Sequence, residues 1–241
     1  AGFFNYFLRD LFKKELSLSK EDLSVYYSYP LFFIEKLKDA YGVEKTEDIL
    51  SVQNQFYPPM VRKRGLPFSF FTLKPNESLE KYLHDPNYYI QNRTPAYLME
   101  NLKSEGFHPH TVLDLCSSPG GKLLLASELF SLKKITANDV SEKKILSLKE
   151  NAEKYKLSLD YTISKGESYP ETEKFDLIIV DAPCSNSGVL HKRAEARWNI
   201  TSDQLRSWND LQFKLLKKAA SLVSEKGQVW YMTCSILKEE N

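Results

Sequence analysis

The sequence predicts an α/β fold in which helices cover both faces of a doubly wound parallel sheet. From about residue 95 onward, segments with apolar residues at helical spacing alternate with short apolar segments. The segment Phe175 to Asp181 contains a run of aliphatic residues, which is typical of a strand buried on both faces. Strand-helix alternation on this scale implies parallel strands joined by right-handed crossovers. Ligands of such sheets bind beyond the carboxyl ends of the strands.

Residues 1–80 differ in composition from the rest of the chain and are expected to form a small α+β subdomain. Aromatic residues and prolines are frequent there. Leu31 to Tyr41 carries apolar residues at helical spacing, and Gly42 suits the end of that helix. Phe68 to Leu73 is expected to be a short strand. Residues 81–241 would then form the larger α/β domain.

The elements of the larger domain are expected in a regular succession that begins with a helix at Pro95. Strands are expected at Thr111–Cys116, Ile135–Asp139, Leu159–Ile163, Phe175–Asp181 and Gln228–Thr233. Helices are expected at Lys122–Phe130, at 142–156, and from an N-cap at Ser202 to Leu222. The predicted strand order is 3-2-1-4-5. Because the chain stops soon after the fifth strand, we expect that strand at an exposed edge, in a fragment that lacks the last strands of its sheet.

The composition is that of an ordinary globular protein, with 42% hydrophobic and 27% charged residues. No apolar run has the length of a membrane span and no signal-peptide layout is present, so a cytoplasmic protein is expected. The odd number of cysteines argues against a disulfide framework, and the histidines and cysteines lack metal-ligand spacing. With a net charge of +1, contacts to nucleic acid would need local patches. The candidate patches are Arg62–Arg64, Lys143–Lys144 and Lys192–Arg193.

A glycine-rich turn after the first strand of the larger domain is the first candidate site. It comprises Cys116, Ser117, Ser118, Pro119, Gly120, Gly121 and Lys122. Glycines let backbone approach a ligand closely at such a turn, although the turn could also be only a tight strand-helix connection. It has neither GxGxxG nor GxxxxGK[ST] spacing. Asp139 ends the second strand, where it is placed either to bind ribose hydroxyls or to cap the next helix.

Two cysteines follow the fourth and fifth strands. Cys184 lies in the segment Asp181-Ala-Pro-Cys, and Cys234 follows Thr233. A single cysteine is more often a small buried hydrophobe than a reactive group. The carboxyl ends of neighbouring parallel strands, however, lie at the same edge of a sheet. Two thiols and a carboxylate beside a glycine-rich turn therefore indicate a reactive site.

The segments at these three strand ends are Asp114–Lys122, Asp181–Cys184 and Thr233–Ser235. Together they resemble the signatures of the NOL1/NOP2/Sun family of RNA cytosine-5 methyltransferases. The likeness extends from about Tyr29 to the last residue and is closest to the bacterial Sun-type enzymes that act on small-subunit rRNA. It implies a Rossmann-like class I methyltransferase fold, S-adenosyl-L-methionine as the cofactor and RNA as the partner. We expect a monomer without a metal.

The resemblance also implies roles for the residues at the strand ends. Cys234 would be the nucleophile that adds to carbon 6 of the cytosine, and Asp181 would bind or protonate N3. Cys184 would remove the carbon 5 proton, directly or through a water, before the enzyme is released. Lys122 would lower the pKa of a thiol or steady the base, unless it is only a solvated residue of the first helical turn.

The cofactor site is implied in the same way. S-adenosylmethionine would bind across Cys116 to Lys122, with Asp139 on its ribose hydroxyls and Asp181 close by. The family usually has an acidic residue near the adenine. Direct alignment places Gly166 at that position, and Glu167 is expected to substitute for the acid.

Three alternatives have to be weighed against an rRNA methyltransferase. The substrate could be tRNA. The fold could belong to a methyltransferase of small molecules or proteins, or to a catalytically idle RNA-binding assembly factor. The presence of both Cys184 and Cys234 argues against the last two, because neither function needs a pair of thiols at adjacent strand ends.

Overall fold

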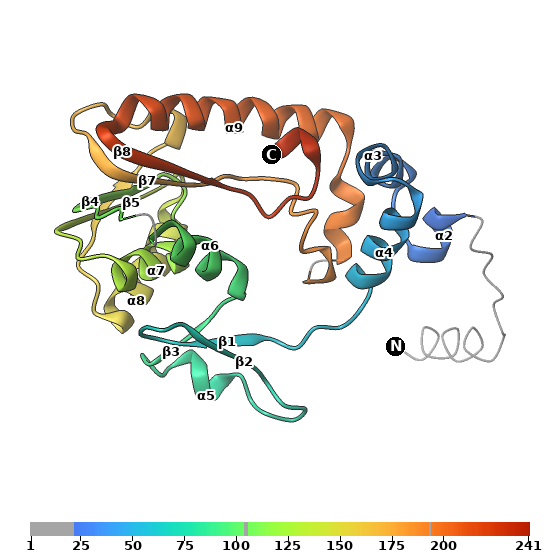
Figure 1. The fold of residues 1–241 in the computed structure, drawn as a ribbon, viewed down its shortest axis with the longest axis horizontal. Helices are drawn as coiled ribbons and strands as arrows, with labels where there is room; N and C mark the ends of the chain where they lie inside the picture. The colour runs from blue at the N-terminus through green and yellow to red at the C-terminus, as the bar shows by residue number, and fades with distance from the viewer. Residues whose placement is uncertain (1–21, 104–105, 193) are drawn as a thin grey trace.

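The computed structural model describes residues 22–103, 106–192 and 194–241 (Figure 1). The start of the predicted small subdomain and Arg193 lie outside these ranges. The strands are β1 (Met60–Lys63), β2 (Ser69–Thr72), β3 (Tyr88–Ile90), β4 (Thr111–Asp114), β5 (Lys134–Asp139), β6 (Asp160–Ile163), β7 (Phe175–Asp181) and β8 (Val223–Met232). The helices are α2 (Leu23–Tyr27), α3 (Leu31–Tyr41), α4 (Val43–Gln53), α5 (Glu80–Leu83), α6 (Arg93–Lys103), α7 (Gly121–Leu129), α8 (Glu142–Tyr155) and α9 (Ser202–Leu222).

The larger sheet is parallel throughout and has the strand order β6-β5-β4-β7-β8. This is the predicted order 3-2-1-4-5, and the predicted doubly wound fold is confirmed. Leu177 and Ile179 pack into the apolar cluster that contains residues of α6, α7 and α8. Ile178 and Val180 pack into the cluster on the other face, with α9. The aliphatic run of β7 is thus buried from both sides, as helix layers above and below the sheet require (Figure 1).

Some boundaries differ from the predicted ones. β8 begins at Val223 rather than at Gln228, and it pairs only with β7 within the described chain. The prediction of Ser202 as the N-cap of α9 was wrong, because Thr201 has that role. Thr201 has extended backbone angles, and its side chain accepts a hydrogen bond from the backbone N–H of Gln204. Ser202 already lies in the first helical turn, where its hydroxyl cannot reach forward in this way.

A second, antiparallel sheet has the order β2-β1-β3 and lies below the larger one in Figure 1. Since β3 comes from residues beyond 80, the predicted boundary at residue 80 passes between strands of one sheet. Arg62 of β1 is fully buried, forms an ion pair with Glu128 of α7 and lies over the ring of Phe68. Arg64 pairs with the same carboxylate at 2.8 Å. Arg62 and Arg64 therefore join the small sheet to α7 and are not a free basic patch for nucleic acid.

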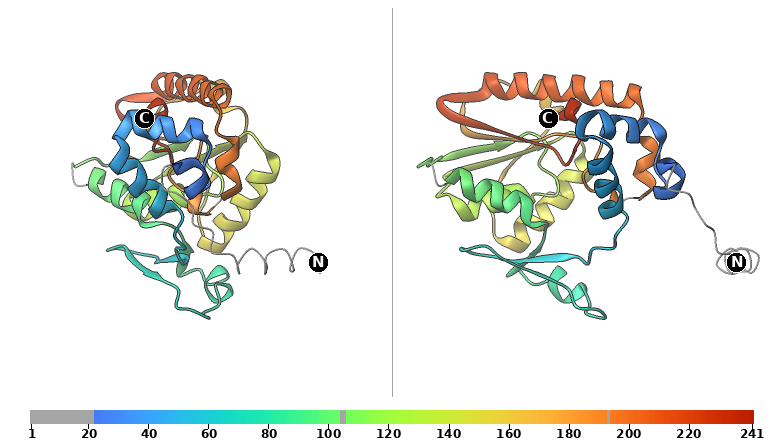
Figure 2. Two further views of the ribbon diagram at one scale, coloured as in Figure 1. Left: turned by 90° about the vertical axis from the view of Figure 1, so that its right-hand side faces the viewer. Right: turned by 45° about the vertical axis from the view of Figure 1, so that its right-hand side comes forward.

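Helices α2 to α4 pack against the loops that follow β7 and β8, as Figure 2 shows for the blue helices. The prediction of a helix from Leu31 to Tyr41 is confirmed. Phe33 and Leu37 of α3 share an apolar cluster with Leu190 and Leu237. Gln53 donates a hydrogen bond from Nε2 to the carbonyl of Ser187 at 2.8 Å. These helices therefore support the two loops that carry the cysteines.

In the part of the chain that the structure describes, no helix combines the length and the apolar character needed to cross a bilayer.

Candidate active site

The turn between β4 and α7 lies at the carboxyl edge of the larger sheet, close to the end of β5. Ser117 binds the carbonyl oxygen of Asn138 through both its backbone N–H and its hydroxyl, at 2.9 Å each. Gly120 has a φ of 98°, in the left-handed region that glycine adopts without strain. A Cβ at Gly121 would lie 2.9 Å from the hydroxyl oxygen of Tyr89, so only glycine allows this close approach. The glycines of the turn are thus required by its packing.

A small hollow of about 180 Å³ opens on one side of the turn. It is lined by Leu115, Cys116, Asp139, Val140, Lys144, Lys165, Gly166, Glu167, Pro183, Leu211 and Leu215. A Cβ at Gly166 would lie 2.6 Å from Cδ2 of Leu215 and 3.1 Å from the carbonyl oxygen of Leu115. A side chain at this position would therefore have to displace Leu215. Glu167 lies next to Gly166 and lines the same hollow as Asp139.

A second hollow of about 190 Å³ opens on the other side of the same turn. It is lined by Tyr89, Ile90, Gln91, Pro95, Asp114, Ser117, Ser118, Pro119, Gly121, Lys122 and Asp181. Lys122 and Asp181 form an ion pair there, between the start of α7 and the end of β7. Lys122 is thus partnered by a carboxylate rather than free in solvent. Of the predicted turn, Cys116 lines the first hollow, and Ser117, Ser118, Pro119, Gly121 and Lys122 line the second.

Asp139 ends β5 with its side chain only 3% exposed. One carboxylate oxygen accepts the backbone N–H of Ser118 at 3.3 Å, and the other accepts that of Ser141 at 3.4 Å. Nζ of Lys144 lies 3.4 Å from the carboxylate. The contact with Ser141 is a local turn contact rather than a helix cap, because Ser141 itself is the N-cap residue of α8. Because Asp139 also lines the hollow beside Gly166, it can reach a ligand there as well.

The two cysteines lie face to face, with their sulfur atoms 3.2 Å apart. Cys184 is buried, and Cys234 is half-buried. The contact with the sulfur of Cys234 lowers the pKa of the Cys184 thiol. The same contact, together with burial, raises the pKa of Cys234 above its usual range. Of the two thiols, Cys234 therefore holds its proton more strongly.

Asp114 and Glu240 were not among the predicted site residues, although Asp114 lies in a segment that carries the resemblance. Burial, then the neighbouring Asp181, raises the pKa of Asp114 to about 7. Glu240 is 2% exposed and accepts hydrogen bonds from the backbone N–H of Ser185 at 2.8 Å and from Nε2 of Gln212 at 3.1 Å. Glu240 thus ties the loop of Cys184 to α9. Nothing in the local pattern of the sequence signals this contact.

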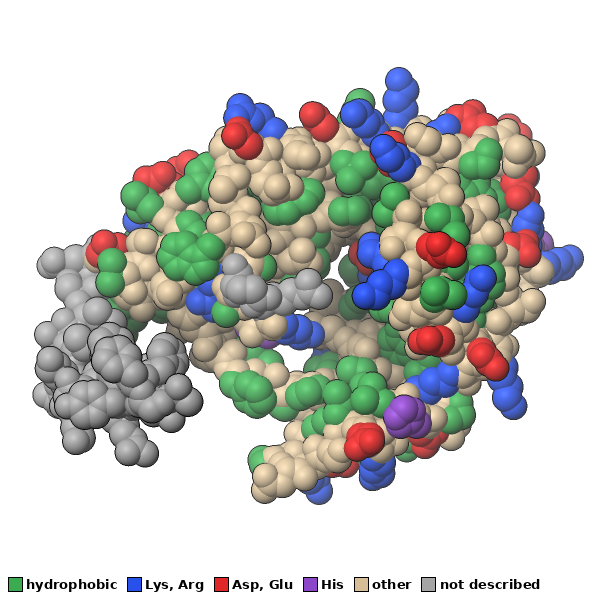
Figure 3. Space-filling model, turned by 180° about the vertical axis from the view of Figure 1, so that it is seen from behind, with side chains coloured by type: hydrophobic (Ala, Val, Ile, Leu, Met, Phe, Trp, Pro, Cys, Tyr) green, Lys and Arg blue, Asp and Glu red, His purple; other side chains and the backbone are tan. Residues whose placement is uncertain are grey.

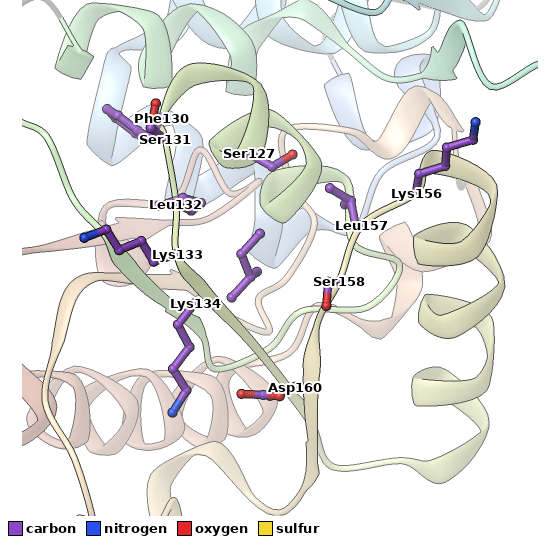
Figure 4. Close-up of a pocket in the computed structure, with 11 residues that line it drawn as sticks. Ser127, Phe130, Ser131, Leu132, Lys133, Lys134, Lys156, Leu157, Ser158 and Asp160 are labelled. Carbon is purple, nitrogen blue, oxygen red and sulfur yellow. The ribbon is translucent and has the colours of Figure 1, made fainter.

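A further hollow lies elsewhere. It measures about 530 Å³ and is formed around the starts of β5 and β6, where Lys134 and Asp160 line it (Figure 4). In a parallel sheet the strand starts lie at the edge opposite to the strand ends. This hollow is therefore remote from the cysteines and from the turn at Gly120. Within the described residues, no cluster of three or more histidine, cysteine or acidic side chains could hold a metal ion.

Residues 102–241, more than half of the chain, match the model of the family described as 16S rRNA methyltransferase RsmB/F. The chain belongs to this family. The RsmB/F match confirms the resemblance seen in the strand-end segments, and it bears out S-adenosylmethionine as the predicted cofactor. The turn, the hollows and the paired cysteines all lie within the matched residues or next to them.

Curated relatives carry the same description. The chain is 27% identical to ribosomal RNA small subunit methyltransferase B of Proteus mirabilis, over 89% of this chain and 57% of the relative. It is 26% identical to the protein of that name from Yersinia enterocolitica, over 100% of this chain and 62% of the relative. The chain thus spans less than two thirds of the length of these RsmB/F relatives.

Solved structures share the fold. The crystal structure of PH0851 superposes with a TM-score of 0.79 at 26% identity, covering 95% of this chain and 58% of that one. A methyltransferase homologue from Pyrococcus horikoshii gives a TM-score of 0.74 at 23% identity, covering 93% and 80%. The structure of NSun6 from Pyrococcus horikoshii with SFG gives a TM-score of 0.59 at 24% identity, and the match covers 70% of this chain and 43% of that one. The last two comparisons concern the fold alone.

The residues of this RsmB/F chain fit S-adenosylmethionine. The hollow beside Gly166 has apolar walls from Leu211 and Leu215, which suit a flat aromatic ring. Asp139 offers a carboxylate at the edge of that hollow for ribose hydroxyls. The second hollow contains the paired charges of Lys122 and Asp181, which suit the charged amino-acid end of the cofactor.

We expect Asp139→Ala to weaken the binding of S-adenosylmethionine by about 1 to 3 kcal/mol, because charge-assisted hydrogen bonds to the ribose would be lost. Isothermal titration calorimetry with the cofactor or its demethylated product measures this change. Asp160→Ala, at the start of β6, is the matched control and should leave the affinity as it is. An unchanged affinity of Asp139→Ala would show that Asp139 only orders the backbone at Ser118 and Ser141.

The raised pKa of Asp114 predicts a pH-dependent stability. The native protein keeps the carboxyl proton up to about pH 7, whereas the unfolded chain releases it near pH 4. Between these values the native state binds more protons, so the free energy of unfolding from this group falls as the pH rises. In Asp114→Asn, the free energy of unfolding measured by urea denaturation should therefore decline less between about pH 4 and pH 7 than in the wild type. The exposed control Asp48→Asn should keep the wild-type slope, and an equal slope in Asp114→Asn would contradict the assignment.

Proposed function

We propose that this protein methylates carbon 5 of a cytosine in small-subunit ribosomal RNA through a covalent cysteine adduct. The observation that carries the proposal is the pair of thiols 3.2 Å apart at the ends of β7 and β8. The pair lies at the same edge of the larger sheet as the glycine-rich turn between β4 and α7. The names of the curated relatives support the choice of substrate. A methyltransferase of small molecules or proteins has no use for such a pair.

The chemistry needs a thiol because carbon 5 of cytosine is a poor nucleophile. As the S–C6 bond forms, the electrons of the C5–C6 double bond shift toward N3, and the thiol proton passes by way of the Asp181 carboxylate to N3, which leaves carbon 5 electron-rich. Asp181 binds N3 and stabilises the ring during this addition, while Lys122 holds the carboxylate in place. S-adenosylmethionine supplies the methyl group. Cys184 then takes the proton from carbon 5, and the S–C6 bond breaks to release Cys234.

The cytosine has to leave its stack, because both faces of its ring are needed. Unpaired bases in loops are the ordinary targets of such enzymes. Seen from behind, the surface is hollowed near its middle, with Lys and Arg side chains on both sides of the hollow (Figure 3). This distribution of charge supports an RNA substrate despite the net charge of only +1. The same proposal places the protein in the cytoplasm, acting as a monomer.

The direct test is the transfer of labelled methyl from S-adenosylmethionine to small-subunit rRNA transcripts and to tRNA. We expect label in the rRNA only. Label in the tRNA would reassign the substrate. The absence of label in both RNAs, together with binding of RNA, would identify an idle assembly factor. Bisulfite sequencing of RNA from cells that lack the gene then identifies the cytosine that loses its modification.

A further inference from the structure

Asn186 contacts both cysteines, and neither the sequence nor the proposed mechanism gives it a role. It lies in the loop after β7, between Cys184 and the segment that approaches Cys234. Its Nδ2 atom donates a hydrogen bond to the backbone carbonyl of Cys184 at 3.0 Å. Its Oδ1 atom accepts one from Sγ of Cys234 at 3.0 Å. The backbone φ of Asn186 is 58°, in the left-handed region that asparagine tolerates better than most residues.

The contact with Cys184 determines which way the amide faces. A backbone carbonyl can only accept a hydrogen bond, so the NH₂ group of Asn186 has to face it. The reversed amide would bring two oxygen atoms to 3.0 Å without a proton between them. The group that faces Cys234 is therefore the side-chain oxygen, which has no proton to give. In this contact the proton has to come from the thiol of Cys234.

The groups around Cys234 include some that raise the pKa of its thiol and one that lowers it. The hydrogen bond with Cys184 and burial raise its pKa most, the negative charges of Cys184 and Asp181 add to this, and Lys122 lowers it. Glu240 acts on the pair through Cys184, whose pKa it raises. An acceptor oxygen favours the protonated form of a thiol, so Asn186 acts in the same direction as burial.

We propose that Asn186 is a positioning residue for Cys234: its side chain links the thiol proton of Cys234 to the backbone of Cys184 and holds Cys234 as a thiol until a substrate displaces the contact. One side chain thereby ties the sulfur of Cys234 to the backbone of Cys184. Attack then coincides with loss of the contact to Oδ1, because the thiol gives up its proton as the new bond forms. The identity of the substrate rests on the proposed function, whereas the effect of Asn186 on the pKa of the Cys234 thiol does not.

The test follows alkylation of Cys234 by iodoacetamide as a function of pH, with the Cys234 peptide quantified by mass spectrometry. Only the thiolate reacts, so the midpoint of the profile reports the pKa of this thiol. Asn186→Gly keeps the left-handed backbone and removes the acceptor. Its midpoint should move to lower pH by about half a unit to one unit, as expected for the loss of one neutral hydrogen bond. Asn186→Asp keeps an acceptor and adds negative charge, so its midpoint should move to higher pH.

The matched control is Asn76→Gly, because Asn76 also has a left-handed φ, of 68°, but lies in the loop after β2. Its Cys234 profile should equal that of the wild type. A midpoint that stays or rises in Asn186→Gly overturns the proposal, and so does a fall in Asn186→Asp. The second variant decides the question if the first does not fold. Neither RNA nor cofactor is present in this experiment, so a failure of methyl transfer would refute the proposed function without affecting this result.

Discussion

Replacing Cys184 by alanine is expected to trap the protein on its RNA, whereas replacing Cys234 by alanine should abolish both the adduct and turnover. Cys234 forms the bond to carbon 6 in the proposed mechanism, so without its sulfur no covalent complex can arise. Cys184 acts after methyl transfer, by removing the proton from carbon 5. Without it the S–C6 bond persists, because release requires that this proton has left.

Denaturing electrophoresis of protein mixed with labelled RNA and S-adenosylmethionine measures the difference. Cys184→Ala should accumulate a band that survives denaturation, and the double variant should lose this band. If the thiols are only structural, both single variants lose stability and neither gives a band. A band in Cys234→Ala alone would exchange the two roles.

Asp181→Asn is expected to lower the rate of methyl transfer on the order of 10²- to 10⁴-fold. An asparagine can neither protonate N3 nor carry the charge that stabilises the ring during thiol addition. It would also leave Lys122 without its carboxylate partner. Single-turnover kinetics with saturating cofactor measures this step apart from cofactor binding.

A variant at the opposite end of the same strand serves as the control for Asp181→Asn. Asp176 accepts hydrogen bonds from the backbone N–H groups of His110 and Thr111, at 2.9 and 3.1 Å. Asp176→Asn should lower the free energy of unfolding and leave the rate of methyl transfer unchanged. Equal rates for Asp181→Asn and wild type would contradict the proposed contact with N3.

The sequence by itself determined the parallel sheet and its strand order, and it predicted the edge of the sheet at which the candidate site lies. Aliphatic runs such as that of β7 are encoded locally, because a strand covered on both faces needs apolar residues in succession. Gly120 and Gly121 likewise predict a tight turn, because glycine adopts backbone conformations that other residues avoid. Since parallel strands end at one edge, Asp139, Asp181 and Cys234 could be assigned to the same rim without coordinates.

Only the tertiary structure decided which side chains meet at that rim. The 3.2 Å contact between Cys184 and Cys234 joins residues fifty positions apart, and it depends on the register of β7 and β8 and on their loops. Burial of Arg62 against Glu128 likewise turned an apparent basic patch into a link between the small sheet and α7. Periodicity reports whether a residue is buried, not what it touches. The partners of Asn186 were therefore decided by the packing of distant segments, because hydrogen bonds require positions accurate to a few tenths of an ångström.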